Sequence, residues 1–158
     1  MHKVNGEAAF VVLVVVVGLV IRQQLRTRPV RRIGSLIVPG VLGVAGIALG
    51  VLSVVKDHSL TALPVILLVV SLAVAAGFGA VRARTVRVWR DPQGVVLRKG
   101  TAATTGLWLA SVGVHLGLGL WIDHVAGAGV LGTVSLYAYL AIGLGTQNLL
   151  VRSRAAAL

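Results

Sequence analysis

The sequence has no cysteine and few acidic residues. Without a thiol, the chain forms no disulfide, thiolate metal site or thiol relay of its own. Its 158 residues include four carboxylates against 15 lysines and arginines, and charged residues of all kinds make up 12%. Hydrophobic residues make up 57%, which is too apolar for the surface of an ordinary soluble protein. We therefore expect an integral membrane protein.

The hydrophobic residues are gathered in stretches long enough to cross a bilayer. A helix of about 20 apolar residues spans a hydrocarbon core of about 30 Å. The first stretch lacks the flanks of a cleaved signal peptide, because its charges follow it, so we expect it to be retained. The sequence predicts an all-α integral membrane bundle of five transmembrane helices, one domain over residues 1–158, with spans at about 4–25, 33–55, 59–81, 100–122 and 125–151.

The basic residues indicate the orientation of this bundle. Five of them follow the first span, six follow the third and two follow the fifth, so that only Lys3 and Lys56 lie on the other side. The positive-inside rule then predicts an outer N-terminus and a cytoplasmic C-terminus in a bacterial-type inner membrane. Since these residues flank spans and accompany no nucleic-acid-binding fold, we exclude nucleic acid and expect membrane lipids as partners.

The connection between the third and fourth spans has the pattern of a short β-hairpin. Residues 85–89 and 95–98 are strand-like, and Pro92 and Gly94 between them suit a tight turn. We predict that the hairpin lies on the cytoplasmic face with Trp89 at the level of the lipid headgroups. Its arginines are expected to attract anionic lipid.

A wider set of features resembles one known family. Arg22–Arg32 lead into the apolar run Ile33–Pro39, the hairpin Val86–Lys99 ends in Arg-Lys-Gly, and the tail is basic. This layout resembles the CcdC family of small bacterial membrane proteins, which also have five spans and basic loops after the first and third. The resemblance covers most of the chain. It implies a fold, and no activity or catalytic residue.

The fourth span carries the strongest candidate site. Ser111 and His115 follow Thr104 and Trp108 at helical spacing, so that the four residues share one face, which is predicted to line the bundle interior. An ionisable group as deep as His115 is a candidate catalytic residue. The alternative interpretation is a neutral histidine hydrogen-bonded to a neighbouring helix. Tyr139 of the fifth span is predicted to line the same interior.

Two Asp-His pairs are predicted near the outer boundary of the membrane. Asp57 and Asp123 are each followed by histidine after a span of nearly equal length, in the manner of an internal repeat. An acid kept protonated there could start a reaction, and aromatic faces could stabilise a cationic intermediate. Ordinary helix-end residues are the alternative interpretation, and we expect no metal site. The candidate aromatic binding residues are Phe78, Trp108, Trp121 and Tyr139, with Ser111 beside them.

Two functions compete at this level. The first is a membrane accessory or assembly component without a cofactor, whose glycine pairs Gly46 with Gly50 and Gly113 with Gly117 allow close packing against other membrane proteins or a second copy. The second is an intramembrane enzyme acting on a hydrophobic small molecule, such as a proton-initiated isoprenoid (terpene) cyclase with Asp57 or Asp123 as the acid. A haem carrier and a transporter rank lower, because the spans hold one deep histidine and no charge pair.

Overall fold

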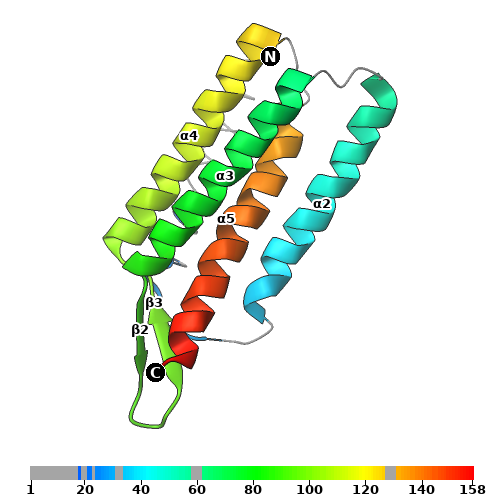
Figure 1. Cartoon of the computed structure of the whole chain (residues 1–158). Coiled ribbons are helices and arrows are strands. Elements are labelled where there is room, and N and C mark those ends of the chain that lie inside the picture. Colours follow the sequence, from blue (N-terminus) through cyan, green and yellow to red (C-terminus); the bar gives the residue numbers. More distant parts are fainter. Residues whose placement is uncertain (1–17, 19–20, 23, 31–33, 58–61, 127–130) are drawn as a thin grey trace, which may run out of the picture.

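The computed structural model describes residues 18, 21–22, 24–30, 34–57, 62–126 and 131–158. This part of the chain is mostly helical, with a small sheet at one end (Figure 1). The helices run across the bundle in the order α4, α3, α5, α2, and α5 contacts all three others. The elements are β1 (Arg28–Pro29), α2 (Gly34–Asp57), α3 (Ala62–Thr85), β2 (Arg87–Arg90), β3 (Val96–Lys99), α4 (Ala102–Ala126) and α5 (Leu131–Ala156).

Glycines bring α5 close to its two main neighbours. A Cβ atom added to Gly79 of α3 would lie 2.5 Å from the carbonyl oxygen of Gly143 in α5, and one added to Gly46 of α2 would lie 3.1 Å from the backbone nitrogen of Ala138. Gly46 therefore packs against α5 of the same chain, and the predicted packing of the glycine pairs against a partner stays a prediction. For Gly113 and Gly117, no described residue offers an atom within 4 Å of such a Cβ.

The helices run past the predicted ends of two spans. We predicted ends at residues 81 and 151, but α3 continues to Thr85 and α5 to Ala156. Arg82 and Arg84 lie in the last turn of α3, and Nε of Arg82 donates to the carbonyl oxygen of Phe78 at 3.4 Å. Arg154 of α5 donates from Nη1 to the carbonyl oxygens of Ala83 and of Val86 (3.0 Å), which satisfies acceptors at the end of α3.

The structure supports the helical fold but fewer spans than the five predicted. Among the described residues, two segments are long and apolar enough to cross a membrane, Val65–Thr85 and Ala102–Trp121. The apolar segment of α2 is shorter, Leu36–Ala48, and α5 carries Gln147 and Asn148 in its second half. The predicted first span falls largely outside the described residues, of which Gly18, Ile21, Arg22, Gln24 and Leu25 are helical.

The two membrane-capable helices bury little of their surface inside the bundle. The buried share of the apolar segment is 22% for Val65–Thr85 and 17% for Ala102–Trp121. Large apolar side chains such as Val69 and Leu120 point outwards. A core helix of a soluble protein would be mostly buried, so this exposure agrees with a membrane location.

The predicted hairpin is present, and it is part of a larger sheet. β2 pairs with β3 across a turn in which Gly94 has a φ of 81° and the Asp91 carboxylate accepts the N–H of Val95 at 2.7 Å. The prediction missed β1, which pairs antiparallel with β3 to give the order β1-β3-β2. Pro29 hid this strand, because proline lacks an N–H and is tolerated only at a sheet edge.

Candidate functional site

The predicted polar face of the fourth span lies inside the bundle. Ser111 and His115 of α4 are 2% and 4% exposed, and they meet Ser71 of α3 and Tyr139 of α5, which are 4% and 1% exposed. We call Ser71, Ser111, His115 and Tyr139 the polar cluster. The prediction that Ser111, His115 and Tyr139 line one interior is confirmed, whereas Ser71 was not predicted.

Hydrogen bonds and a ring contact connect the polar cluster. The hydroxyls of Tyr139 and Ser111 are 2.8 Å apart, and the Tyr139 hydroxyl also lies 3.0 Å from the Ser111 carbonyl oxygen, to which it donates. Nδ1 of His115 lies 3.4 Å from Oγ of Ser71. The His115 and Tyr139 rings have centroids 4.4 Å apart at 38°. The cluster therefore joins three helices through buried polar contacts.

The chemistry of this cluster is that of a hydroxyl and imidazole network. A serine nucleophile needs a base within about 3.2 Å and a third group that orients the base. Oγ of Ser71 and Nδ1 of His115 are 3.4 Å apart. Within the described residues, no group of three or more histidine, aspartate or glutamate side chains could hold a metal ion.

Thr104, on the predicted polar face, has a different role. Its backbone N–H donates to Oγ1 of Thr101 at 3.3 Å, and its own Oγ1 accepts the N–H of Thr101 at 3.0 Å. Its hydroxyl also lies 2.9 Å from that of Thr85, the last residue of α3. These bonds cap the start of α4 and fasten it to the end of α3.

The four aromatic candidates do not gather around one cavity. Tyr139 is buried in the polar cluster, Trp108 lines a pocket near the sheet, and Phe78 is partly buried on α3. Trp121 is 56% exposed. It follows His115 by six residues, which turns it about 240° around α4 and away from the buried face. Trp121 therefore lies on a different face of α4 from His115, and its role as a binding residue stays a prediction.

The two predicted acids lie at the end of the bundle away from the sheet. Asp57 is the last residue of α2, and Asp123 lies in the last turn of α4 (Figure 1). Asp123 follows His115 by eight residues, which is about 12 Å along a helix axis. The side chains of both acids lie outside what the structure describes, as does His58, so the acid role of Asp57 or Asp123 stays a prediction.

The sheet end of the bundle holds a second candidate site. A pocket of about 430 Å³ lies between the sheet, α2, α4 and α5. Its volume falls in the range of small-ligand sites, about 300–1,000 Å³. We call it the basic pocket, because its polar wall consists of Gln24, Arg26, Arg28, Arg98, Gln147 and Asn148.

The sequence does not predict the basic pocket as a site. The sequence indicates Arg26 and Arg28 only as orientation signals, and Arg98 in addition as one of the hairpin arginines expected to attract anionic lipid. The missing information was that β1 pairs with β3, which places Arg28 directly opposite Arg98. The polar pair Gln147 and Asn148 near a basic loop was the available signal, and Arg98 donates to Oδ1 of Asn148 at 2.8 Å.

Known proteins add no further information on either site. No family model, curated protein or solved structure matches this chain. The resemblance to the CcdC family therefore stays a prediction.

Proposed function

We propose that this protein is a five-span inner-membrane protein that acts as an accessory or assembly component without a cofactor of its own. The observation that carries the proposal is the low burial of the apolar segments of α3 and α4, of which only 22% and 17% is buried within the chain. Such surfaces need lipid or the helices of a partner around them. The proposed orientation is N-terminus outside and C-terminus in the cytoplasm.

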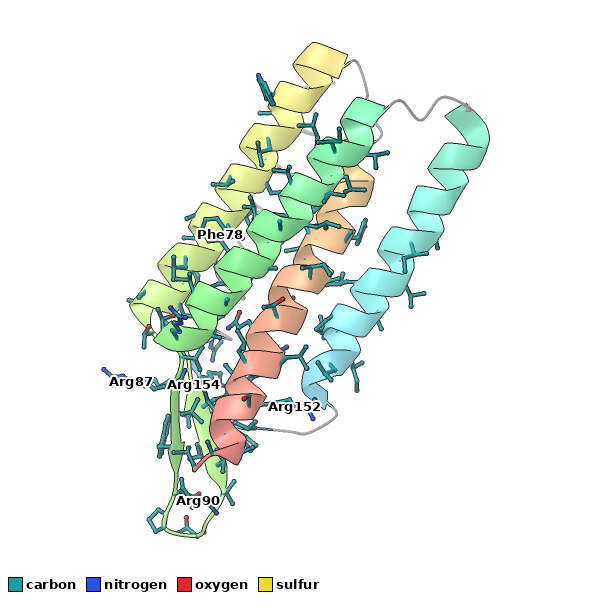
Figure 2. All side chains as sticks on the ribbon, viewed as in Figure 1. Phe78, Arg87, Arg90, Arg152 and Arg154 are labelled. Carbon is teal, nitrogen blue, oxygen red and sulfur yellow. The ribbon has the colours of Figure 1, made fainter. Side chains whose placement is uncertain are left out.

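The distribution of charge supports this orientation. Arg87 and Arg90 on the hairpin and Arg152 and Arg154 on α5 lie at the sheet end of the bundle (Figure 2). The opposite end carries Asp57 and the predicted outer connections. Basic groups at a membrane surface are retained on the cytoplasmic side.

The polar cluster supports a packing role for the interior. Its hydrogen bonds connect α3, α4 and α5, and its members are at least nine-tenths buried. Polar contacts of this kind between membrane helices typically contribute about 1 kcal/mol or less each. Histidine, serine and tyrosine at these positions therefore serve the proposed component as connections between its helices.

The absence of cysteine makes the orientation directly testable. We would introduce single cysteines by Gln93→Cys in the hairpin turn and Ser59→Cys in the connection after α2, and treat cells with a maleimide that cannot cross the inner membrane. Ser59→Cys is expected to react in intact spheroplasts, and Gln93→Cys only after the membrane is disrupted. The opposite order of labelling would contradict the proposed orientation.

A second experiment separates an accessory component from an enzyme. The protein would be purified in native lipid particles, and its bound small molecules identified by mass spectrometry in the wild type and in His115→Ala, Asp57→Asn and Asp123→Asn. We expect the four samples to carry the same molecules. A compound that is present in the wild type and absent from one variant would overturn the accessory proposal in favour of an intramembrane enzyme.

The isoprenoid cyclase alternative gains no support from the described residues. Such a reaction needs a protonated acid and aromatic faces around one substrate. The side chain of Trp121 is exposed on the surface of α4, and Trp108 lies near the sheet. Asp123 lies at the opposite end of α4 from the sheet. The accessory function therefore remains our proposal.

A further inference from the structure

The basic pocket combines positive charge with an apolar wall. Arg26, Arg28 and Arg98 lie on its sheet side, and no carboxylate is among the described residues that line it. Asp91, the acid at this end that the structure describes, instead accepts the N–H of Val95 in the hairpin turn. Among the described residues that line the pocket, the three guanidinium groups therefore have no anionic partner.

Two of these arginines are forced together by strand pairing. Arg28 of β1 and Arg98 of β3 occupy opposite positions in the antiparallel register. Like charges directly opposite each other are unfavourable in a sheet. Burial, and then the positive charge of Arg28, lower the pKa of Arg98. A bound anion would relieve this repulsion, and guanidinium groups bind phosphate oxygens in a bidentate manner.

The pocket also contains buried hydrogen-bond acceptors in need of a donor. The Oε1 atoms of Gln24 and Gln147 are buried and have no hydrogen-bond partner. Gln147 is only 9% exposed, and both residues line the pocket. Buried amide oxygens without a partner are rare in folded proteins, and each calls for an explanation. A ligand that supplies hydroxyl donors beside an anionic group would satisfy both requirements.

The remaining wall is suited to a hydrocarbon chain. Val38 and Pro39 of α2 and Leu140 and Leu144 of α5 line the pocket on its membrane side. Val38 is 58% exposed, so the apolar wall continues onto the outer surface of the bundle. The pocket therefore presents charge where lipid headgroups lie and apolar surface where acyl chains begin.

We infer that the basic pocket binds one anionic phospholipid whose headgroup carries hydroxyl groups, as in phosphatidylglycerol. The phosphate contacts Arg26, Arg28 and Arg98, the headgroup hydroxyls donate to Gln24 and Gln147, and an acyl chain lies against Leu140 and Leu144. This inference depends on the membrane location proposed above. It adds a specific lipid site to that function.

The test is a lipid competition measured by native mass spectrometry. The purified full-length protein would be exposed in detergent to equal amounts of phosphatidylglycerol and phosphatidylcholine, and the retained lipid counted. The wild type is expected to retain one phosphatidylglycerol. Arg28→Gln and Arg98→Gln are each expected to reduce that retention about tenfold. Arg28 is exposed, so Arg28→Gln tests the site even where Arg98→Gln impairs folding.

The matched control is Arg87→Gln on β2. It removes the same charge from the same sheet, but Arg87 is exposed, does not line the pocket and projects away from the bundle (Figure 2). This control is expected to retain phosphatidylglycerol as the wild type does. Equal losses in Arg87→Gln and Arg28→Gln, or equal retention of the two lipids, would overturn the inference.

Inorganic phosphate provides the second arm of the test. Addition of phosphate to the wild type is expected to leave the lipid in place, because phosphate lacks the acyl chain and the hydroxyl donors. Displacement of the lipid would assign the site to free phosphate and overturn the lipid inference. Neither result changes the maleimide labelling, so failure of the lipid site and failure of the proposed orientation are distinguishable.

Discussion

At the scale of single residues, Tyr139 connects two members of the polar cluster on α4. Its hydroxyl lies within hydrogen-bonding distance of both the side chain and the carbonyl oxygen of Ser111, and its ring lies against His115. The tyrosine is 1% exposed, so its hydroxyl has no access to water that could replace these bonds. Loss of this one oxygen leaves a buried serine hydroxyl without its partner.

We predict that Tyr139→Phe lowers the free energy of unfolding by about 1 kcal/mol. The change removes the hydroxyl and keeps the ring contact with His115. The measurement is reversible unfolding in mild detergent by added sodium dodecyl sulfate, followed by circular dichroism. The control is Tyr137→Phe, two residues away on another face of α5, which is expected to have little effect. Equal losses in the two variants would contradict the role assigned to Tyr139.

Residue spacing predicted much of the polar cluster. Ser111 and His115 are buried because they lie four residues apart on one face of α4. The same rule explains why Trp121, six residues after His115, is exposed. Spacing within α4 could not identify Ser71, since a contact between helices depends on their relative depth and rotation. The basic pocket could not be predicted for the same reason, because its lining residues come from distant parts of the chain.

At the scale of the elements, the contact between α3 and α5 depends on two facing glycines. Gly79 lies so close to the backbone of Gly143 that any side chain would force the helices apart. A Cβ added to Gly143 would in turn lie 2.9 Å from Nη2 of Arg82. This close approach also brings Arg154 to the carbonyl groups at the end of α3.

Gly79→Leu is expected to destabilise the bundle by about 1–3 kcal/mol, which is the usual effect of overpacking a close contact. Gly77→Leu on the same helix is the control, since Gly77 is exposed and no described atom lies within 4 Å of an added Cβ. The control is expected to be neutral or slightly stabilising, because leucine favours helix more than glycine does. Thermal unfolding in detergent measures both. A tolerated Gly79→Leu would refute the close contact.

The position of β1 depends on the close approach of Gln24, which precedes this strand, to Gly100. Its N–H donates to the carbonyl oxygen of Gln24 at 3.0 Å, and an added Cβ would lie 2.6 Å from that oxygen. We predict that Gly100→Ala displaces the segment before β1 and reduces phosphatidylglycerol retention about tenfold. Gly106→Ala, which meets no described atom within 4 Å, is expected to retain the lipid. Retention in both variants would show that the segment before β1 does not shape the pocket.

At the scale of the whole molecule, the outward apolar surface determines how the protein behaves in water. Only 22% of the apolar segment Val65–Thr85 and 17% of Ala102–Trp121 is buried within the chain, and exposed apolar surface of this kind marks contact with lipid or a partner. We predict that the protein stays in the membrane pellet after extraction with alkaline carbonate and enters solution only with detergent. Immunoblotting of the two fractions measures this. Release by carbonate alone would contradict a membrane-spanning bundle.

The sequence by itself determined the helical class, the approximate positions of α2 to α5, the hairpin and the inward face of α4. These features follow from local rules, namely hydrophobic length, turn residues and helical spacing. Only the tertiary structure decided the pairing of β1 with β3, the contact of Ser71 with His115 and the basic pocket. Each of these joins residues distant in the chain. Such contacts depend on how helices and strands pack, which no single segment specifies.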